Sequence, residues 1–279
     1  MLRQMIGCIA LIVVCGAAPL FAQNKPAPLK VLLITGGGYH DYAKQIPYIT
    51  EQIAKRANVQ FDVSWGPKNS QEVPPIVGAK NFGEGYDAVV FDFCYAADSA
   101  DIDPAKYENV IKASEAGKPM VLIHCSMHCF RRVPKQDWPK FIGMRTNHHE
   151  PYGPFAVRPE DLTDPITKGW PGDWKTAGDE QYVTEEVYPG VKKLLISTGV
   201  REKERHPTNV VAWQHMNGQG RVFGTTLGHD MKTSQDPHYQ QLLANGLLWA
   251  CDKLDDNGQP RLGYQGPGVL KAHTLEETK

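Results

Sequence analysis

The sequence predicts an α/β fold in which a mainly parallel sheet is covered by helices on both faces. Three observations support this expectation. Short, continuously apolar segments recur along the chain, as is typical of strands buried on both faces. Segments with helical periodicity alternate with them, as in parallel sheets. With 41% hydrophobic and 22% charged residues, the composition is that of a globular protein and excludes a highly charged disordered chain.

The first half of the chain shows this alternation most clearly. The apolar segment 29–35 predicts a buried strand that ends at the glycines 36–38. Residues 44–57 then place their isoleucines on one face of a helix. The other elements expected in this half are strands at 60–65, 86–93 and 119–123 and a helix at 104–116.

The second half is less regular. Residues 130–190 are rich in Pro, Gly, Trp and His, and they predict an elaborated insertion that covers the strand ends. The elements expected here are a short strand at 155–158, strands at 192–197, 210–214 and 221–226, and an amphipathic helix at 238–251. No segment has the composition of a linker. We therefore expect one domain over residues 23–254 and a polar tail over 255–279 that wraps around the domain or extends from it.

Residues 1–22 predict a secretory signal peptide. Arg3 precedes a short apolar stretch, and small residues lead to Ala22, after which we expect cleavage. The stretch is too short for a membrane span. Val14 stands where lipidation of Cys15 would require a small residue, so a lipoprotein is the less favoured interpretation. The expected location is periplasmic or extracellular.

Charge and cysteine content narrow the function classes. The 30 basic and 31 acidic residues leave a net charge of −1, which disfavours nucleic acid as a partner. Cleavage of the signal would leave Cys94, Cys125, Cys129 and Cys251, too few to hold the fold together by disulfides. One bridge among them is compatible with an oxidising compartment, but the spacing does not identify its partners.

Polar residues follow several of the expected strands. Function in open parallel sheets gathers beyond the carboxyl ends of the strands, so we predict one polar pocket there, with the insertion contributing residues to it. The candidate catalytic residues are His40, Asp41, His124, Glu180 and His229. The candidate substrate-binding residues are Gly37, Tyr39, His128, His149 and Tyr182.

These motifs, in this order, resemble the trehalose-utilisation (ThuA-like) family over about residues 30–252. They are GGGYHD (36–41), a strand ending at His124, the pair His148-His149, DEQY (179–182) and GRVFGTTLGHD (220–230). The resemblance implies a flavodoxin-like three-layer sandwich related to class I glutamine amidotransferases. It also implies a role in carbohydrate metabolism, particularly with disaccharides oxidised to 3-keto sugars. Amidotransferases of this class carry a nucleophilic cysteine directly after the strand that corresponds to residues 119–123. At that position this chain has His124, followed by Cys125.

The leading hypothesis is an exported enzyme that acts on a disaccharide or 3-keto-glycoside by general acid–base chemistry. A 3-keto group acidifies the neighbouring C–H, so a base such as His124 or His229 removes that proton while Glu180 acts as an acid. In a metal-assisted version, a divalent ion such as zinc is the cofactor. Its candidate ligands are His124, His149, Glu180 and His229. The sequence leaves the choice between the two versions open.

Two other functions compete with these hypotheses. One is a non-catalytic periplasmic carbohydrate-binding protein that stacks sugars on Trp138, Trp170, Trp174 or Tyr182, although these aromatic residues equally suit a core. The other is a thiol hydrolase that uses Cys94 or Cys125, which oxidation of an exported thiol disfavours. A small carbohydrate is the expected partner, and the sequence does not indicate an oligomeric state.

Overall fold

The computed structural model describes residues 25–66, 72–198 and 208–275. The predicted signal peptide, residues 1–22, lies outside these ranges. Within them, no helix has both the length and the apolar character needed to cross a membrane.

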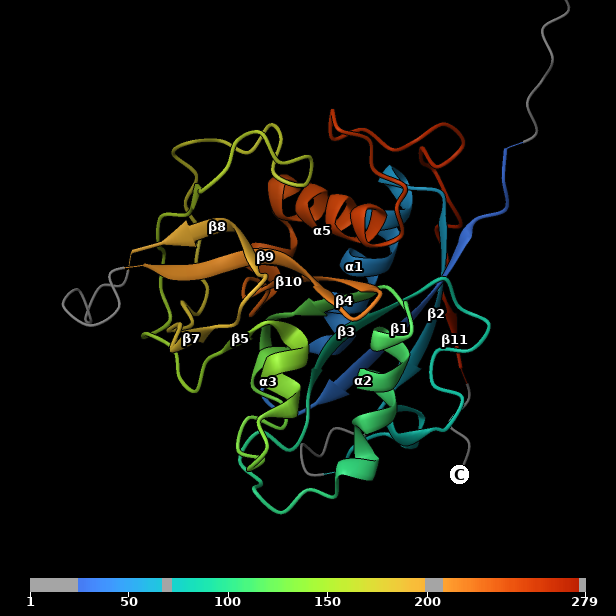
Figure 1. Cartoon of the computed structure of the whole chain (residues 1–279). Coiled ribbons are helices and arrows are strands. Elements are labelled where there is room, and N and C mark those ends of the chain that lie inside the picture. The colour runs from blue at the N-terminus through green and yellow to red at the C-terminus, as the bar shows by residue number, and fades with distance from the viewer. Residues whose placement is uncertain (1–24, 67–71, 199–207, 276–279) are drawn as a thin grey trace, which may run out of the picture.

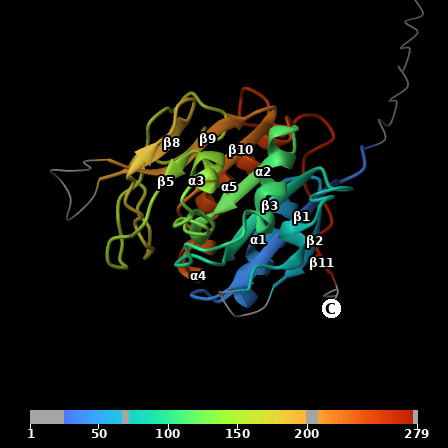
Figure 2. The ribbon, with the colours of Figure 1, turned by 60° about the horizontal axis from the view of Figure 1, so that its bottom comes forward.

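A nine-stranded sheet forms the centre of the molecule, in the order β11-β2-β1-β3-β4-β10-β9-β8-β6. The pairs from β11 to β10 are parallel, and β9, β8 and β6 extend the sheet antiparallel. Figure 2 shows β2 and β11 at one side of the sheet and β8 and β9 at the other. The strands are β1 (Leu29–Gly37), β2 (Val59–Trp65), β3 (Ala88–Cys94), β4 (Met120–Ile123), β6 (Arg158–Pro159), β8 (Lys192–Ser197), β9 (Asn209–Asn217), β10 (Gly220–Thr225) and β11 (His273–Thr274).

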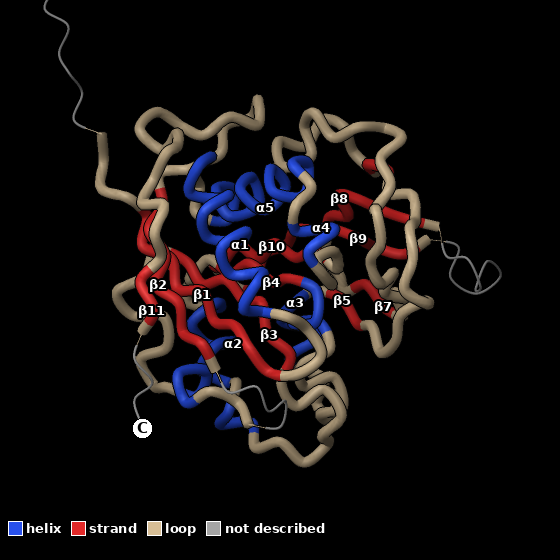
Figure 3. Tube along the Cα trace, turned by 180° about the vertical axis from the view of Figure 1, so that it is seen from behind, coloured by secondary structure: helices blue, strands red, loops and turns tan. Residues whose placement is uncertain are grey.

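Helices cover both faces of this sheet, which confirms the predicted α/β sandwich. The helices α1 (Tyr42–Arg56) and α5 (Pro237–Ala250) lie on one face (Figure 3). The helices α2 (Glu108–Glu115) and α3 (Asp137–Ile142) lie on the other (Figure 1). Alternation along β1 assigns side chains to the two cores: Val31 packs with the α1–α5 side, and Leu32 with the α2–α3 side.

The insertion between β4 and β8 is more structured than the sequence predicts. It contains α3 and a small ribbon of β5 (Met144–Arg145) and β7 (Glu186–Val187). The prediction of a strand at 155–158 is wrong in its bounds. The strand in this region, β6, has only two residues, and they pair with β8. Elements this short depend on tertiary contacts and leave no periodic signal in the sequence.

The polar tail was expected either to wrap around the domain or to extend from it. Residues 255–275 wrap around the domain. The backbone of Asn58 donates to Tyr264 O at 2.8 Å, and Val269 N donates to Val59 O at 2.8 Å. The strand β11 then pairs with β2, with His273 opposite Asp62. This segment therefore covers the edge of the sheet beside β2.

The chain order places a topological switch between β1 and β3. From β1 the sheet grows to β2 on one side, and to β3, β4 and β10 on the other. This is the flavodoxin-like arrangement, in which ligands bind beyond the carboxyl ends of the strands at the switch. The glycines that end β1 lie directly against β3: Gly37 is opposite Cys94 and has φ +93°.

We expect Gly37→Ala to lower the free energy of unfolding by about 2–5 kcal/mol. A Cβ there would lie 2.3 Å from the carbonyl oxygen of Cys94. Overpacking costs about 1–3 kcal/mol, and left-handed backbone adds about 1–2 kcal/mol for a residue other than Gly. Gly85→Ala is the matched control, because Gly85 has φ +79° but no atom within 4 Å of the added Cβ. Equal loss of stability in urea for the two variants would show that the contact with Cys94 imposes no constraint.

Candidate functional site

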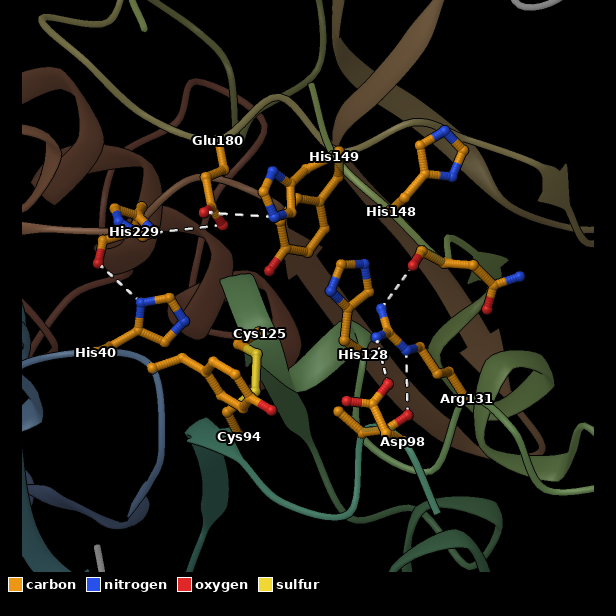
Figure 4. Close-up of a pocket in the computed structure, with 14 residues that line it drawn as sticks. His40, Cys94, Asp98, Cys125, His128, Arg131, His148, His149, Glu180 and His229 are labelled. Carbon is orange, nitrogen blue, oxygen red and sulfur yellow. Dashed lines mark hydrogen bonds and ion pairs between the residues drawn. A yellow bond between two sulfur atoms is a disulfide. The ribbon is translucent and has the colours of Figure 1, made fainter. Parts of the chain in front are cut away.

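A pocket of about 320 Å³ opens beyond the carboxyl ends of β1, β3, β4 and β10 (Figure 4). Its volume lies within the range of small-molecule sites. The strand ends and the insertion both supply its lining residues, which are Tyr39, His40, Cys94, Ala97, Asp98, Cys125, His128, Arg131, Asn147, His148, His149, Glu180, Tyr182 and His229.

Most of the predicted site residues meet in this pocket, and three lie elsewhere. His124 lies beneath the lining, with 1% of its surface exposed, and its ring contacts His40 and His229. Gly37 and Asp41 line a neighbouring hollow beside α1 instead. The Asp41 carboxylate pairs with Lys44 at 2.7 Å and is half exposed.

Three histidines from three strands form the floor of the site. His40 follows β1, His124 immediately follows β4, and His229 follows β10. Their ring centroids are 4.8 Å (His40–His124), 4.9 Å (His40–His229) and 5.5 Å (His124–His229) apart. His124 has φ +46°, a left-handed conformation that is rare outside Gly and is often found at functional sites.

Backbone carbonyl groups orient three of the imidazoles. His40 Nδ1 donates to His229 O at 3.1 Å, and His124 Nδ1 donates to Thr226 O at 2.7 Å. In the insertion, His149 Nδ1 donates to Glu150 O at 2.8 Å. Because a carbonyl oxygen only accepts hydrogen bonds, the proton must be on Nδ1 in each case. In the neutral ring, Nε2 then carries a lone pair.

The carboxylate of Glu180 lies among three of these rings. Its oxygens are 3.4 Å from His124 Nε2, 3.4 Å from His149 Nε2 and 3.3 Å from His229 Nδ1. Burial opposes ionisation of Glu180, but hydrogen bonds from His124 and His229 prevail and hold its pKa well below the usual range. Glu180 is therefore ionised, which suits a base better than the acid role expected from the sequence.

The pKa values of two histidines that pack against each other on the floor shift in opposite directions. Burial lowers the pKa of His124, but the hydrogen bond to Glu180 and the charge of Asp179 raise it above its usual value. Burial, together with the charges of His124 and His229, lowers the pKa of His40 to about 3. Of the two rings in contact, His124 therefore takes up a proton more readily than His40.

Asp179 holds the loop that carries His229, a role that the sequence did not reveal. Its buried carboxylate accepts hydrogen bonds from Gly228 N at 2.9 Å, His229 N at 3.2 Å and Glu180 N at 2.7 Å. It thereby connects the insertion to the loop after β10. The sequence shows Asp179 only as the first residue of the DEQY segment (179–182), next to Glu180.

Aromatic residues form one wall and the rim. Tyr182 and His128 are buried and stack with ring centroids 4.0 Å apart, so they support the wall. Tyr39 is 67% exposed at the rim. Tyr152, which the sequence analysis missed, is 42% exposed and its ring lies 5.3 Å from His229.

The tryptophans considered as sugar platforms are core residues. Trp138 belongs to α3 and is fully buried in the core on that side of the sheet. Trp170 and Trp174 are 7% and 8% exposed and pack against each other on the other face of the sheet. The interpretation of these residues as core anchors is therefore confirmed.

A disulfide joins Cys94, at the end of β3, to Cys125, in the turn after β4. Both residues line the pocket. Burial raises the pKa of the Cys129 thiol to about 12 and that of Cys251 to about 12. In this state neither disulfide sulfur is a thiolate, so a thiol hydrolase is not supported.

Comparison with known proteins identifies the family. A family model described as "ThuA: Trehalose utilisation" matches residues 30–250. No curated protein matches the sequence.

Several solved structures share the fold. A ThuA-like protein from Parabacteroides merdae ATCC 43184 has 22% identity and a TM-score of 0.62, over 80% of this chain and 90% of that chain. A ThuA-like protein from Bacteroides uniformis ATCC 8492 has 16% identity and a TM-score of 0.57, over 84% and 96%. A protein described as part of a GMP synthase, from Thermoplasma acidophilum, has 13% identity and a TM-score of 0.52, over 81% and 94%. At these identities the likeness shows a common fold alone, and it confirms the predicted architecture.

Asp179→Ala should destabilise the protein by about 2–4 kcal/mol, because a buried N–H left without an acceptor costs about 1–3 kcal/mol. Urea unfolding measures the change. Asp173→Ala, in an exposed part of the same insertion, is the control and should change stability by no more than about 0.5 kcal/mol. A similar small effect for both variants would contradict the role assigned to Asp179.

Thiol counting tests the disulfide. In protein that lacks residues 1–22, two cysteines, Cys129 and Cys251, should react with a thiol reagent after denaturation without reductant. All four should react after reduction. Four reactive thiols in the unreduced, denatured protein would show that Cys94 and Cys125 are not joined.

Proposed function

The chain belongs to the ThuA family, described as trehalose utilisation, and from this premise we propose that it is an exported enzyme that acts on a disaccharide or its 3-keto derivative by general acid–base chemistry. The observation that carries the proposal is the position of Glu180, whose ionised carboxylate faces three imidazoles, two in the pocket lining and one beneath it. A base and several proton donors within one small-molecule pocket are the groups that such chemistry requires.

A 3-keto-glycoside gives this site a defined reaction. The base takes the proton from C2, next to the carbonyl, and the electrons of that bond form an enolate. The enolate then expels the glycosidic oxygen from C1, and an acid gives that oxygen a proton. The net result is an elimination that releases the second sugar, and later addition of water to the new double bond would complete a hydrolysis.

The geometry supports a role for each group. Glu180 is the proposed base, because it is the carboxylate that faces the pocket among the imidazoles. His149 is the proposed acid, because it lies on the exposed side of Glu180 with 41% of its side chain accessible. His229 lines the pocket beside Glu180, with 25% of its side chain accessible, and would stabilise the negative charge that develops on the enolate oxygen.

The disulfide supports the exported location. Disulfides persist in oxidising compartments such as the periplasm or the outside of the cell and are rare in the cytosol. The Cys94–Cys125 bond is therefore compatible with the signal peptide expected at residues 1–22.

The test is incubation of the mature protein with trehalose, other disaccharides and their 3-keto forms, followed by product analysis. We expect cleavage of the keto form, and we expect Glu180→Gln to reduce kcat by about 10²–10⁴-fold, the usual contribution of a general base. Glu186→Gln is the control, because Glu186 lies on β7 outside the pocket lining, and its turnover should equal that of the unchanged protein.

Two outcomes would contradict the proposal. One is tight binding of a sugar without any product, which would instead support the carbohydrate-binding alternative. The other is turnover that is the same in Glu180→Gln and Glu186→Gln, which would remove Glu180 from the reaction.

A further inference from the structure

The three histidines on the pocket floor offer nitrogen donors to a common point. One ring nitrogen from each of His40, His124 and His229 lies within 4.8 Å of the other two. We propose that these three residues bind a divalent transition-metal ion of the zinc class. This ligand set differs from the one expected from the sequence, because His40 takes the place of His149 and Glu180 lies beside the three donors.

The orientation of the rings suits ligands more than a chance cluster. His40 and His124 each fix Nδ1–H on a backbone carbonyl, at 3.1 Å and 2.7 Å, and direct Nε2 elsewhere. Histidines that bind metals almost always donate their other N–H to a carbonyl, carboxylate or water in this way. The partner carbonyl of His40 belongs to His229, so two of the proposed ligands also hold each other in place.

The distances require only a small adjustment. Zinc binds imidazole nitrogen at about 2.0–2.1 Å with tetrahedral geometry, which places ligand nitrogens about 3.4 Å apart. The three donors are within 4.8 Å of one another, so modest rotations of the rings close the triangle. Each histidine closely follows a strand of the same sheet, which holds its backbone near the other two.

The chemistry of the donors selects the class of ion. Three imidazoles suit zinc and its neighbours in the transition series, whereas magnesium and calcium prefer oxygen ligands. Three protein ligands leave a fourth position open, which is the arrangement of catalytic zinc sites. Glu180 lies 3.4 Å from His124 Nε2 and 3.3 Å from His229 Nδ1, near enough to contact whatever occupies that position.

The disulfide excludes a competing ligand set. His40, Cys94 and Cys125 also have donor atoms within 4.8 Å of one another. Metals bind cysteine as the thiolate, and the Cys94–Cys125 bond removes both thiolates. In the oxidised protein, His40 is therefore free to join His124 and His229.

Metal uptake tests the site without any sugar. The mature protein is stripped with a chelator, dialysed, and titrated with Zn²⁺ by calorimetry and with Co²⁺ by visible absorption, whose intensity reports tetrahedral coordination. We expect one ion per chain. His40→Ala and His229→Ala should each weaken binding by at least about 100-fold, because loss of even an outer-shell partner costs about 10–100-fold. His124→Gln should do the same and keeps most of the buried volume.

Two controls make the result specific. His148→Ala removes another imidazole that lines the pocket but lies outside the three donors, so its affinity should be unchanged. A variant that combines Cys94→Ser with Cys125→Ser should also retain the ion. Circular dichroism confirms that each variant is folded before titration.

Three outcomes would overturn the proposal. They are failure of the stripped protein to retain either ion, equal loss of affinity in His148→Ala and His229→Ala, and loss of binding in the double serine variant with retention in His229→Ala. Because uptake is measured without substrate, an ion that binds to a protein inactive on all sugars would support this site and contradict only the proposed function.

Discussion

The register of the parallel strands is the constraint on which the site depends. Pairing of β1 with β3 sets Gly37 opposite Cys94, and pairing of β10 with β4 sets Thr225 opposite Ile123. The segments that follow these strands therefore start from one edge of the sheet. Three histidines far apart in the sequence reach one pocket floor without a local metal or catalytic motif, because the ladder of hydrogen bonds has already aligned the strands that carry them.

The insertion supplies the carboxylate that lies among the histidines. Asp179 and Glu180 are adjacent, yet they act on different partners. The buried Asp179 carboxylate holds backbone N–H groups of the loop after β10, whereas the carboxylate of Glu180 faces imidazole side chains. The first interaction fixes the position from which His229 meets Glu180. The geometry of the site therefore depends on the docking of the insertion as much as on the sheet.

The sequence predicted the fold best where the pattern of apolar and polar residues matches the burial of those residues in the structure. Continuous apolar runs predicted the strands, and the polar residues at their ends predicted a common pocket. The direction of a single loop side chain leaves no such signal. Asp41 was expected to line the same pocket as the histidines, but it lines a neighbouring hollow and pairs with Lys44. The pairing of Cys94 with Cys125 likewise required knowledge that β3 and β4 are neighbours in the sheet. Two-residue strands such as β5 and β7 show no periodicity, because contacts with distant segments stabilise them.

The turn after β4 shows how one fold supports different chemistry. In the resemblance to class I glutamine amidotransferases, this turn carries a nucleophilic cysteine. Here the residue with left-handed backbone is His124, and Cys125 beside it is bound to Cys94. The group that this turn presents is an imidazole whose Nδ1 donates to Thr226 O. A likeness in fold therefore cannot assign the reaction, which depends on the side chains placed at the strand ends. In this chain those side chains are nitrogen donors gathered around a carboxylate, a set suited to moving protons and holding a cation rather than to forming a thioester.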